Sequence, residues 1–170
     1  MTLGNPSTTD RLVAVEEIKS LFAARLRAMD NKNWSLYPSF HTDDVVSETW
    51  SGLPEDKQPS TGEDSGRVVG PENLTAAIRG MLDGPRQITS VHHGHTPEIT
   101  LTSETTATGV WAMEDRLWWT SDGGEEHLHG FGHYHEEYRK VDGTWLISYR
   151  KLTRMRVENT PHFFDYLEAL

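Results

Sequence analysis

Two kinds of side chain in this sequence, histidine and aspartate, stand where they could transfer a proton. Three of the histidines fall within the six residues at 90–95. The run is typical of a strand, so His92 and His93 point to opposite faces of a sheet and at least one imidazole faces inward. Histidine is the side chain best matched to proton transfer near neutral pH. The run therefore offers a candidate general base.

Asp30 is the candidate carboxylate partner for that base. Steps of four residues from Ile18 lead through Phe22 and Leu26 to Asp30, which continues the buried row of an amphipathic helix. A buried carboxylate needs a partner, and an inward His92 would supply one. The alternative is that Asp30 only ends the helix and turns the chain, as aspartate commonly does.

A second inward acid is predicted in the strand at 106–119. One face of that strand is apolar except for Asp115. Asp115 is therefore a candidate for binding substrate, or for donating a proton if an apolar site keeps it protonated. An ion pair with Arg150 or Arg154 on a neighbouring strand is the equally supported alternative.

Aromatic and glycine residues indicate where a ligand would lie. On one face of the strand at 127–140, Gly130 and Gly132 would leave empty volume, and Tyr134 would give a ligand a hydroxyl partner. Trp50 and Trp111 are large and flat, which suits a polycyclic or aromatic substrate. The alternatives are a bend at the glycines and aromatic residues that only fill the core.

The opposite face of the same strand carries His133, His135 and Glu137, which are types that bind first-row metals. Two histidines flanking one residue resemble a cupin motif. A cupin has a glutamate four residues after the second histidine, where this sequence has Arg139. We therefore predict a surface row of histidines, with no metal and no organic cofactor.

The elements that must position these residues follow from periodicity and turn residues. Helices are predicted at about 10–40, in two pieces, and at 71–83, and an exposed loop is predicted at 51–66. Strands are predicted at 45–50, 67–69, 87–95, 98–102, 106–119, 127–140 and 144–157, with a tight turn at Asp142 and Gly143. This order predicts an α+β fold, a cone-shaped, strongly curved, mostly antiparallel sheet with the N-terminal helices on its concave face.

Length, charge and composition narrow the function. A chain of 170 residues suits a single domain at 1–170, in which the apolar tail at 158–170 would be a lid or an interface helix. The net charge of -10 disfavours nucleic acid and anionic lipid as partners. The absence of cysteine excludes thiolate catalysis and zinc-thiolate sites. With no membrane-spanning run and no signal pattern, a cytoplasmic protein is expected.

Three short motifs, residues 30–34, 92–99 and 138–145, resemble in order and spacing the SnoaL-like branch of the nuclear transport factor 2-like superfamily. Scytalone dehydratase, bile acid 7α-dehydratase and hexachlorocyclohexane dehydrochlorinase belong to that neighbourhood, and the resemblance covers about 10–157. It implies that Asp30 orients His92 as the general base of an elimination. The sequence departs from scytalone dehydratase in having Met29 where that enzyme has a tyrosine, and Trp111 where it has a second pocket histidine.

The resemblance leaves two functions open. One is a cofactor-independent lyase or isomerase for a small hydrophobic compound, with Tyr134 or Asp115 as the candidate acid. The other is a non-catalytic binding or assembly protein of the same fold. The related dehydratases are trimers, so a homo-oligomer is expected by analogy.

Overall fold

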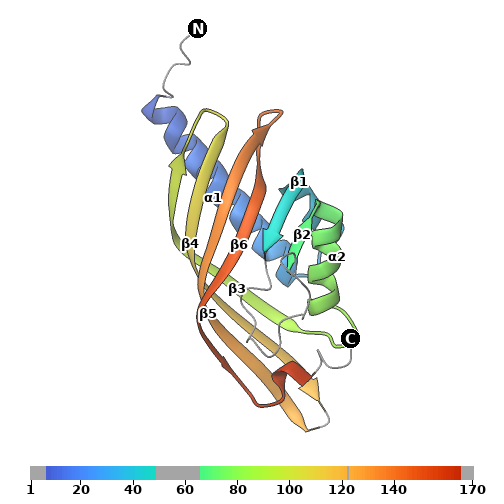
Figure 1. Ribbon diagram of the computed structural model, residues 1–170. Helices are drawn as coiled ribbons and strands as arrows, with labels where there is room; N and C mark the ends of the chain where they lie inside the picture. Colours follow the sequence, from blue (N-terminus) through green and yellow to red (C-terminus); the bar gives the residue numbers. More distant parts are fainter. Residues whose placement is uncertain (1–6, 49–65, 122, 166–170) are drawn as a thin grey trace.

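The computed structural model describes residues 7–48, 66–121 and 123–165, which form two α-helices, a short 3-10 helix and one six-stranded sheet (Figure 1). The sheet order is β2-β1-β6-β5-β4-β3, with one parallel pair, β1 and β6. The elements are α1 (Thr8–Asp30), η1 (Tyr37–Phe40), β1 (His41–Glu48), β2 (Arg67–Val69), α2 (Pro71–Leu82), β3 (Thr89–Leu101), β4 (Thr106–Ser121), β5 (Gly124–Val141) and β6 (Thr144–Asn159). The predicted α+β class is confirmed. Neither of the two α-helices is long and apolar enough to span a membrane.

Helix α1 begins at a capping box. Ser7 accepts a hydrogen bond from the backbone N–H of Asp10, whose carboxylate accepts one from the backbone N–H of Ser7. The predicted apolar row is buried, with Ile18, Phe22 and Leu26 no more than 6 % exposed. The helix therefore packs this row toward the sheet and ends with Asp30.

Other boundaries differ from those predicted. The second helical piece is only a 3-10 turn, because Pro38 has no backbone N–H to donate in an α-helix. The strands predicted at 87–95 and 98–102 form one strand, β3, with a register shift between Gly94 and Pro97. The loop at 51–66, except Gly66, and Trp50 lie outside the described residues.

The turn between β5 and β6 is the predicted tight hairpin. Asp142 and Gly143 both have positive φ, at 48° and 83°. Two successive residues in the left-handed region give a connection whose twist matches that of the flanking strands. Val141 and Thr144 pair across it, which fixes the register of the two strands.

The inward face of β5 alternates as predicted, but the two glycines do not leave room for a ligand. A Cβ added at Gly130 would overlap the Arg154 guanidinium, and one at Gly132 would overlap the Thr153 carbonyl oxygen. The glycines are needed because the Arg154 side chain and the backbone of β6 approach β5 closely. The expectation of empty volume there is wrong.

The C-terminal tail, as far as it is described, joins the core. Phe163 is fully buried and Phe164 is 6 % exposed. The Trp119 indole N–H donates to the Phe163 carbonyl at 3.1 Å, which ties the tail to the end of β4.

A buried ion pair connects α1 to β5. Arg25 Nη2 lies 2.8 Å from Glu136 Oε1, and both side chains are fully buried. Glu136 also accepts a hydrogen bond from the Tyr138 hydroxyl at 2.7 Å, and that hydroxyl accepts one from the Trp111 indole at 2.8 Å. The carboxylate is thus held by two donors in the middle of the core.

Breaking this pair on one side should be costly. Arg25→Met leaves the Glu136 carboxylate buried without its cation, so we expect a loss of about 3–5 kcal/mol in the free energy of unfolding, measured by urea denaturation. The double variant Arg25→Met, Glu136→Gln should recover part of that loss. A loss below about 1 kcal/mol in the single variant would show that the pair does not hold α1 to the sheet.

Candidate functional site

Asp30 and His92 meet where the end of α1 crosses β3. Asp30 Oδ1 lies 2.6 Å from His92 Nδ1, and Asp30 Oδ2 accepts the His92 backbone N–H at 2.9 Å. The His92 side chain is 8 % exposed and the Asp30 side chain 21 %. The carboxylate therefore grips both the ring and the backbone of the histidine, which fixes the ring orientation.

The geometry also assigns the proton on the ring. An ionised carboxylate only accepts hydrogen bonds, so His92 Nδ1 carries a hydrogen and Nε2 has the free lone pair. Among the described residues, His92 Nε2 has no hydrogen-bond partner. This nitrogen is the one that can take a proton from a bound molecule.

The Asp30 carboxyl is held in its ionised form. Burial alone would raise its pKa, but the hydrogen bond and positive charge of the His92 ring, the His92 backbone N–H and the Ser90 hydroxyl outweigh burial. The net effect is a pKa below the ordinary value for aspartate. The carboxylate is thus charged at neutral pH and stabilises an imidazolium beside it.

A pocket of about 450 Å³ opens between α1 and β3 and contains both residues. Phe22, Leu26 and Trp111 supply apolar surface, and the Phe22 and Trp111 rings are stacked 3.7 Å apart. Lys19 and Arg27 also line it, and both lie on α1. The arrangement combines one free imidazole nitrogen with an aromatic wall in a space suited to a small molecule.

The structure does not bring the other inward candidates into this pocket. Asp115 lies directly across from His92 in the β3–β4 register, but it is bound in a two-point ion pair by Arg154, with one contact at 2.6 Å. The structure thus has the ion pair with Arg154 that the sequence offered as the alternative to a pocket role for Asp115, and the Asp115 carboxylate accepts both hydrogen bonds. Tyr134 is 2 % exposed in the core, where burial and the Asp115 charge raise its pKa to about 12. The predicted substrate contacts of both residues remain predictions, as does that of Trp50.

The row of histidines lies on the outer face of the sheet. His129 bonds to Glu114 at 2.7 Å and His135 to Thr153 at 3.0 Å. Within residues 7–48, 66–121 and 123–165, no three His, Asp or Glu side chains are arranged to hold a metal ion.

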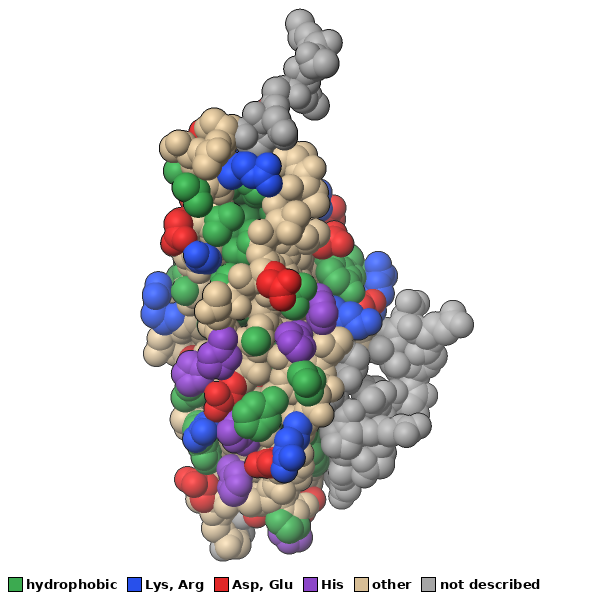
Figure 2. All heavy atoms as spheres, turned by 90° about the vertical axis from the view of Figure 1, so that its left-hand side faces the viewer, with side chains coloured by type: hydrophobic (Ala, Val, Ile, Leu, Met, Phe, Trp, Pro, Cys, Tyr) green, Lys and Arg blue, Asp and Glu red, His purple; other side chains and the backbone are tan. Residues whose placement is uncertain are grey.

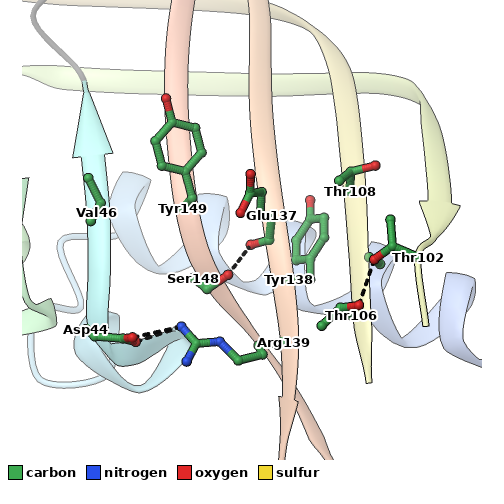
Figure 3. Close-up of a pocket in the computed structure, with 11 residues that line it drawn as sticks. Asp44, Val46, Thr102, Thr106, Thr108, Glu137, Tyr138, Arg139, Ser148 and Tyr149 are labelled. Carbon is green, nitrogen blue, oxygen red and sulfur yellow. Dashed lines mark hydrogen bonds and ion pairs between the residues drawn. The ribbon is translucent and has the colours of Figure 1, made fainter. Parts of the chain in front are cut away.

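A second pocket, of about 550 Å³, is separate from the Asp30–His92 pair (Figure 3). Its side chains include hydroxyls of β4 and β6 and the ion pair between Arg139 and Asp44. Two tyrosines line it, and each hydroxyl donates to a glutamate, Tyr149 to Glu48 at 2.6 Å and Tyr138 to Glu136 at 2.7 Å. Without a free imidazole, it has no base comparable to His92.

Sequence reasoning missed two residues that are linked to the pair by hydrogen bonds, Ser90 directly and Lys32 through Ser90. Ser90 donates to Asp30 Oδ1 at 2.9 Å, and Lys32 donates to the Ser90 hydroxyl at 2.8 Å. The signal for Ser90 was present, since strand alternation puts it on the same face as His92. Lys32 gave no such signal, because it lies in a turn after the helix.

The fold is shared with solved structures of low sequence identity. A hexachlorocyclohexane dehydrochlorinase of Novosphingobium barchaimii is 18 % identical, with a TM-score of 0.72 over 91 % of this chain and 95 % of that one. A candidate scytalone dehydratase of Novosphingobium aromaticivorans is 18 % identical, with a TM-score of 0.71 over 91 % and 92 %. A protein of Kribbella flavida is 21 % identical, with a TM-score of 0.71 over 94 % and 97 %.

At these identities the structural similarity establishes the cone-shaped fold, and the family follows from the sequence. The model of the SnoaL-like domain family matches residues 10–151, which include both Asp30 and His92. The chain therefore belongs to the SnoaL-like domain family, within the nuclear transport factor 2-like superfamily that its motifs indicated.

Proposed function

We propose that this protein is a cofactor-independent lyase, dehydratase-like, or an isomerase, in which His92 is the general base and Asp30 orients it. The observation that carries the proposal is the 2.6 Å contact between Asp30 and His92 Nδ1, which leaves Nε2 free beside a pocket. The names of two structural neighbours, a dehydrochlorinase and a candidate dehydratase, denote eliminations and support the same class.

The proposed reaction balances without a cofactor. His92 Nε2 removes a proton from the carbon next to a carbonyl group, and the C–H electron pair becomes an enolate. The enolate then forms the carbon–carbon double bond and expels a β-hydroxyl group, which leaves as water after protonation. The imidazolium of His92 can return its proton to that hydroxyl if both groups lie on one face of the substrate. In an isomerase the same proton would return to carbon.

The pocket favours a small, flat and largely apolar substrate. Its aromatic wall is formed by Phe22 and Trp111, and its volume of about 450 Å³ is at the small end for ligand sites. A hydroxy-ketone with an aromatic or polycyclic body fits both the surface and the chemistry.

A non-catalytic binding protein is the second candidate. The stacking of Phe22 on Trp111 supports it, because the two rings form a flat apolar surface on which a molecule could bind without being converted. The two candidates differ in whether bound molecules are converted.

Loss of the base should separate them. A panel of aromatic β-hydroxy-ketones would be followed by the absorbance of the enone product, and His92→Ala should lower kcat/KM by about 10²–10⁴-fold for any substrate found. His95→Ala is the matched control, since His95 lies on the same strand and is 57 % exposed. Binding without turnover would favour the binding protein, and equal rates of turnover in His92→Ala and the wild type would rule out His92 as the base.

The depressed pKa of Asp30 predicts a pH-dependent stability. A carboxyl whose pKa is lower in the folded state stabilises the fold above its unfolded pKa of about 3.9, and this contribution is lost as pH falls through the folded pKa. The difference in unfolding free energy between the wild type and Asp30→Asn should therefore shrink as pH is lowered from 7 toward 3. Asp43→Asn, at an exposed position, is the control. A difference that stays constant with pH would contradict an ionised Asp30.

We also propose a homo-oligomer, a trimer by family analogy. Histidine and apolar side chains gather on one face of the molecule (Figure 2). Met155 of β6 is 76 % exposed and Val91 of β3 is 36 % exposed, which is unusual for such apolar side chains. Light scattering after size exclusion should give a mass of about three chains, and Met155→Asp should lower it. A wild-type mass of one chain would refute the proposal.

A further inference from the structure

Lys32 occupies a backbone position that normally takes glycine. Its φ is 57°, in the left-handed region. It follows the helix cap Asn31, and the turn has two hydrogen bonds, from Lys32 N–H to the Met29 carbonyl at 3.1 Å and from Asn33 N–H to the Ala28 carbonyl at 2.8 Å. These are the two bonds of a Schellman motif, in which the left-handed residue is usually glycine because it lacks a Cβ. A lysine here is held in strain, which is a reason to ask what its side chain does.

The Lys32 side chain turns back toward the candidate site. Its Nζ donates to Ser90 Oγ at 2.8 Å, and Ser90 Oγ lies 2.9 Å from Asp30 Oδ1. An ammonium group can only donate, so the Ser90 hydroxyl accepts from Lys32 and gives its own hydrogen to Asp30. Asp30 Oδ1 accepts from His92 Nδ1 as well. The four groups thus form one chain, and each of its three hydrogen bonds has an assigned donor and acceptor.

We propose that Lys32 and Ser90 are positioning residues, which hold the Asp30 carboxylate ionised and aimed at His92. They extend the pair to a directed chain, from Lys32 through Ser90 to Asp30 and His92. Their importance for catalysis rests on the proposed function, but their effect on Asp30 does not. Ser90 is 5 % exposed, so its hydroxyl has a defined partner on each side and little access to water.

The charges around the chain support this assignment. Lys32 is half-buried, and burial lowers the pKa of its ammonium group, while the charges of Asp30 and Asp83 act in the opposite sense. Asp83 follows α2 and is fixed by the Trp34 indole N–H at 2.8 Å. The groups that bond to Asp30 are His92 and Ser90 of β3, and Lys32 of the turn acts through Ser90. Lys19, Arg27 and His93 line the same pocket as Asp30, and Asp83 acts on Lys32 by its charge. Through the hydroxyl of Ser90, the Lys32 ammonium group is linked to the Asp30 carboxylate by hydrogen bonds.

The alternative is that Lys32 only covers the end of α1. The two roles predict different results for Lys32→Gly. Glycine suits the left-handed position, so this variant should melt no lower than the wild type. If Lys32 is a positioning residue, the same variant should nevertheless raise the pKa of Asp30, because a cation and an ordered hydroxyl donor are lost together.

The test is a titration of the Asp30 carboxyl carbon by ¹³C NMR, in the wild type and three variants. Lys32→Gly and Ser90→Ala should both move the Asp30 midpoint to higher pH, by an amount that exceeds the effect of the control Lys19→Met. Lys19 is the matched control because it is a lysine of the same pocket that bonds to Glu16 instead of to Asp30 or Ser90. An unchanged midpoint in Lys32→Gly, or an equal shift in Lys19→Met, would overturn the proposal.

The experiment needs no substrate, so its outcome is separate from that of the proposed function. Midpoints that move as expected in a protein without lyase activity would support the positioning chain and count against the lyase. If a substrate is found, Lys32→Gly should lower kcat more than it raises KM, with Lys32→Arg recovering part of the loss. Full kcat in Lys32→Gly would overturn the positioning role while leaving His92 as the base.

Discussion

The hydrogen bond between the Asp30 carboxylate and the His92 ring joins the last residue of α1 to an edge strand of the sheet. Successive helical residues are rotated by about 100°, so one residue more or less in α1 would turn Asp30 away from β3. A one-residue slip of β3 would likewise send His92 to the outer face. The capping box at Ser7, the buried row of α1 and the register of β3 on β4 therefore act together to set one contact.

A second constraint is that each charge buried in the interior needs a partner of opposite charge. Arg25 with Glu136 and Arg154 with Asp115 each place a cation on an anion inside the sheet, where a single charge would be strongly destabilising. These pairs and the Trp111 and Tyr134 rings occupy the concave side among the described residues. The pocket that reaches His92 consequently lies between α1 and β3 and does not include Asp115 or Tyr134.

The sequence predicted side-chain burial correctly where apolar residues recur at a regular spacing. The four-residue row of α1 and the alternation of β5 predicted which side chains are buried, and Asp30 and His92 could be paired because each falls on such a pattern. The glycines of β5 misled because an absent side chain signals either empty space or a close neighbour, and Arg154 comes from a strand more than twenty residues away in the chain. Lys32 was missed for a similar reason, since its role depends on a left-handed turn that lysine seldom adopts.

The positions of the charged groups also bear on how one histidine could serve a complete elimination. A base that only accepts a proton needs a separate acid for the leaving group, yet Asp115 is held by Arg154 and burial makes Tyr134 a weaker acid than usual. An ionised Asp30 stabilises the imidazolium of His92 without taking its proton, so that proton stays available for return. In the proposed reaction a single nitrogen, His92 Nε2, removes and returns the proton, so both steps would occur on the same face of the substrate. If His92 is the base of the proposed function, the substrates that it implies are those in which the acidic hydrogen and the leaving group are on one side of the ring.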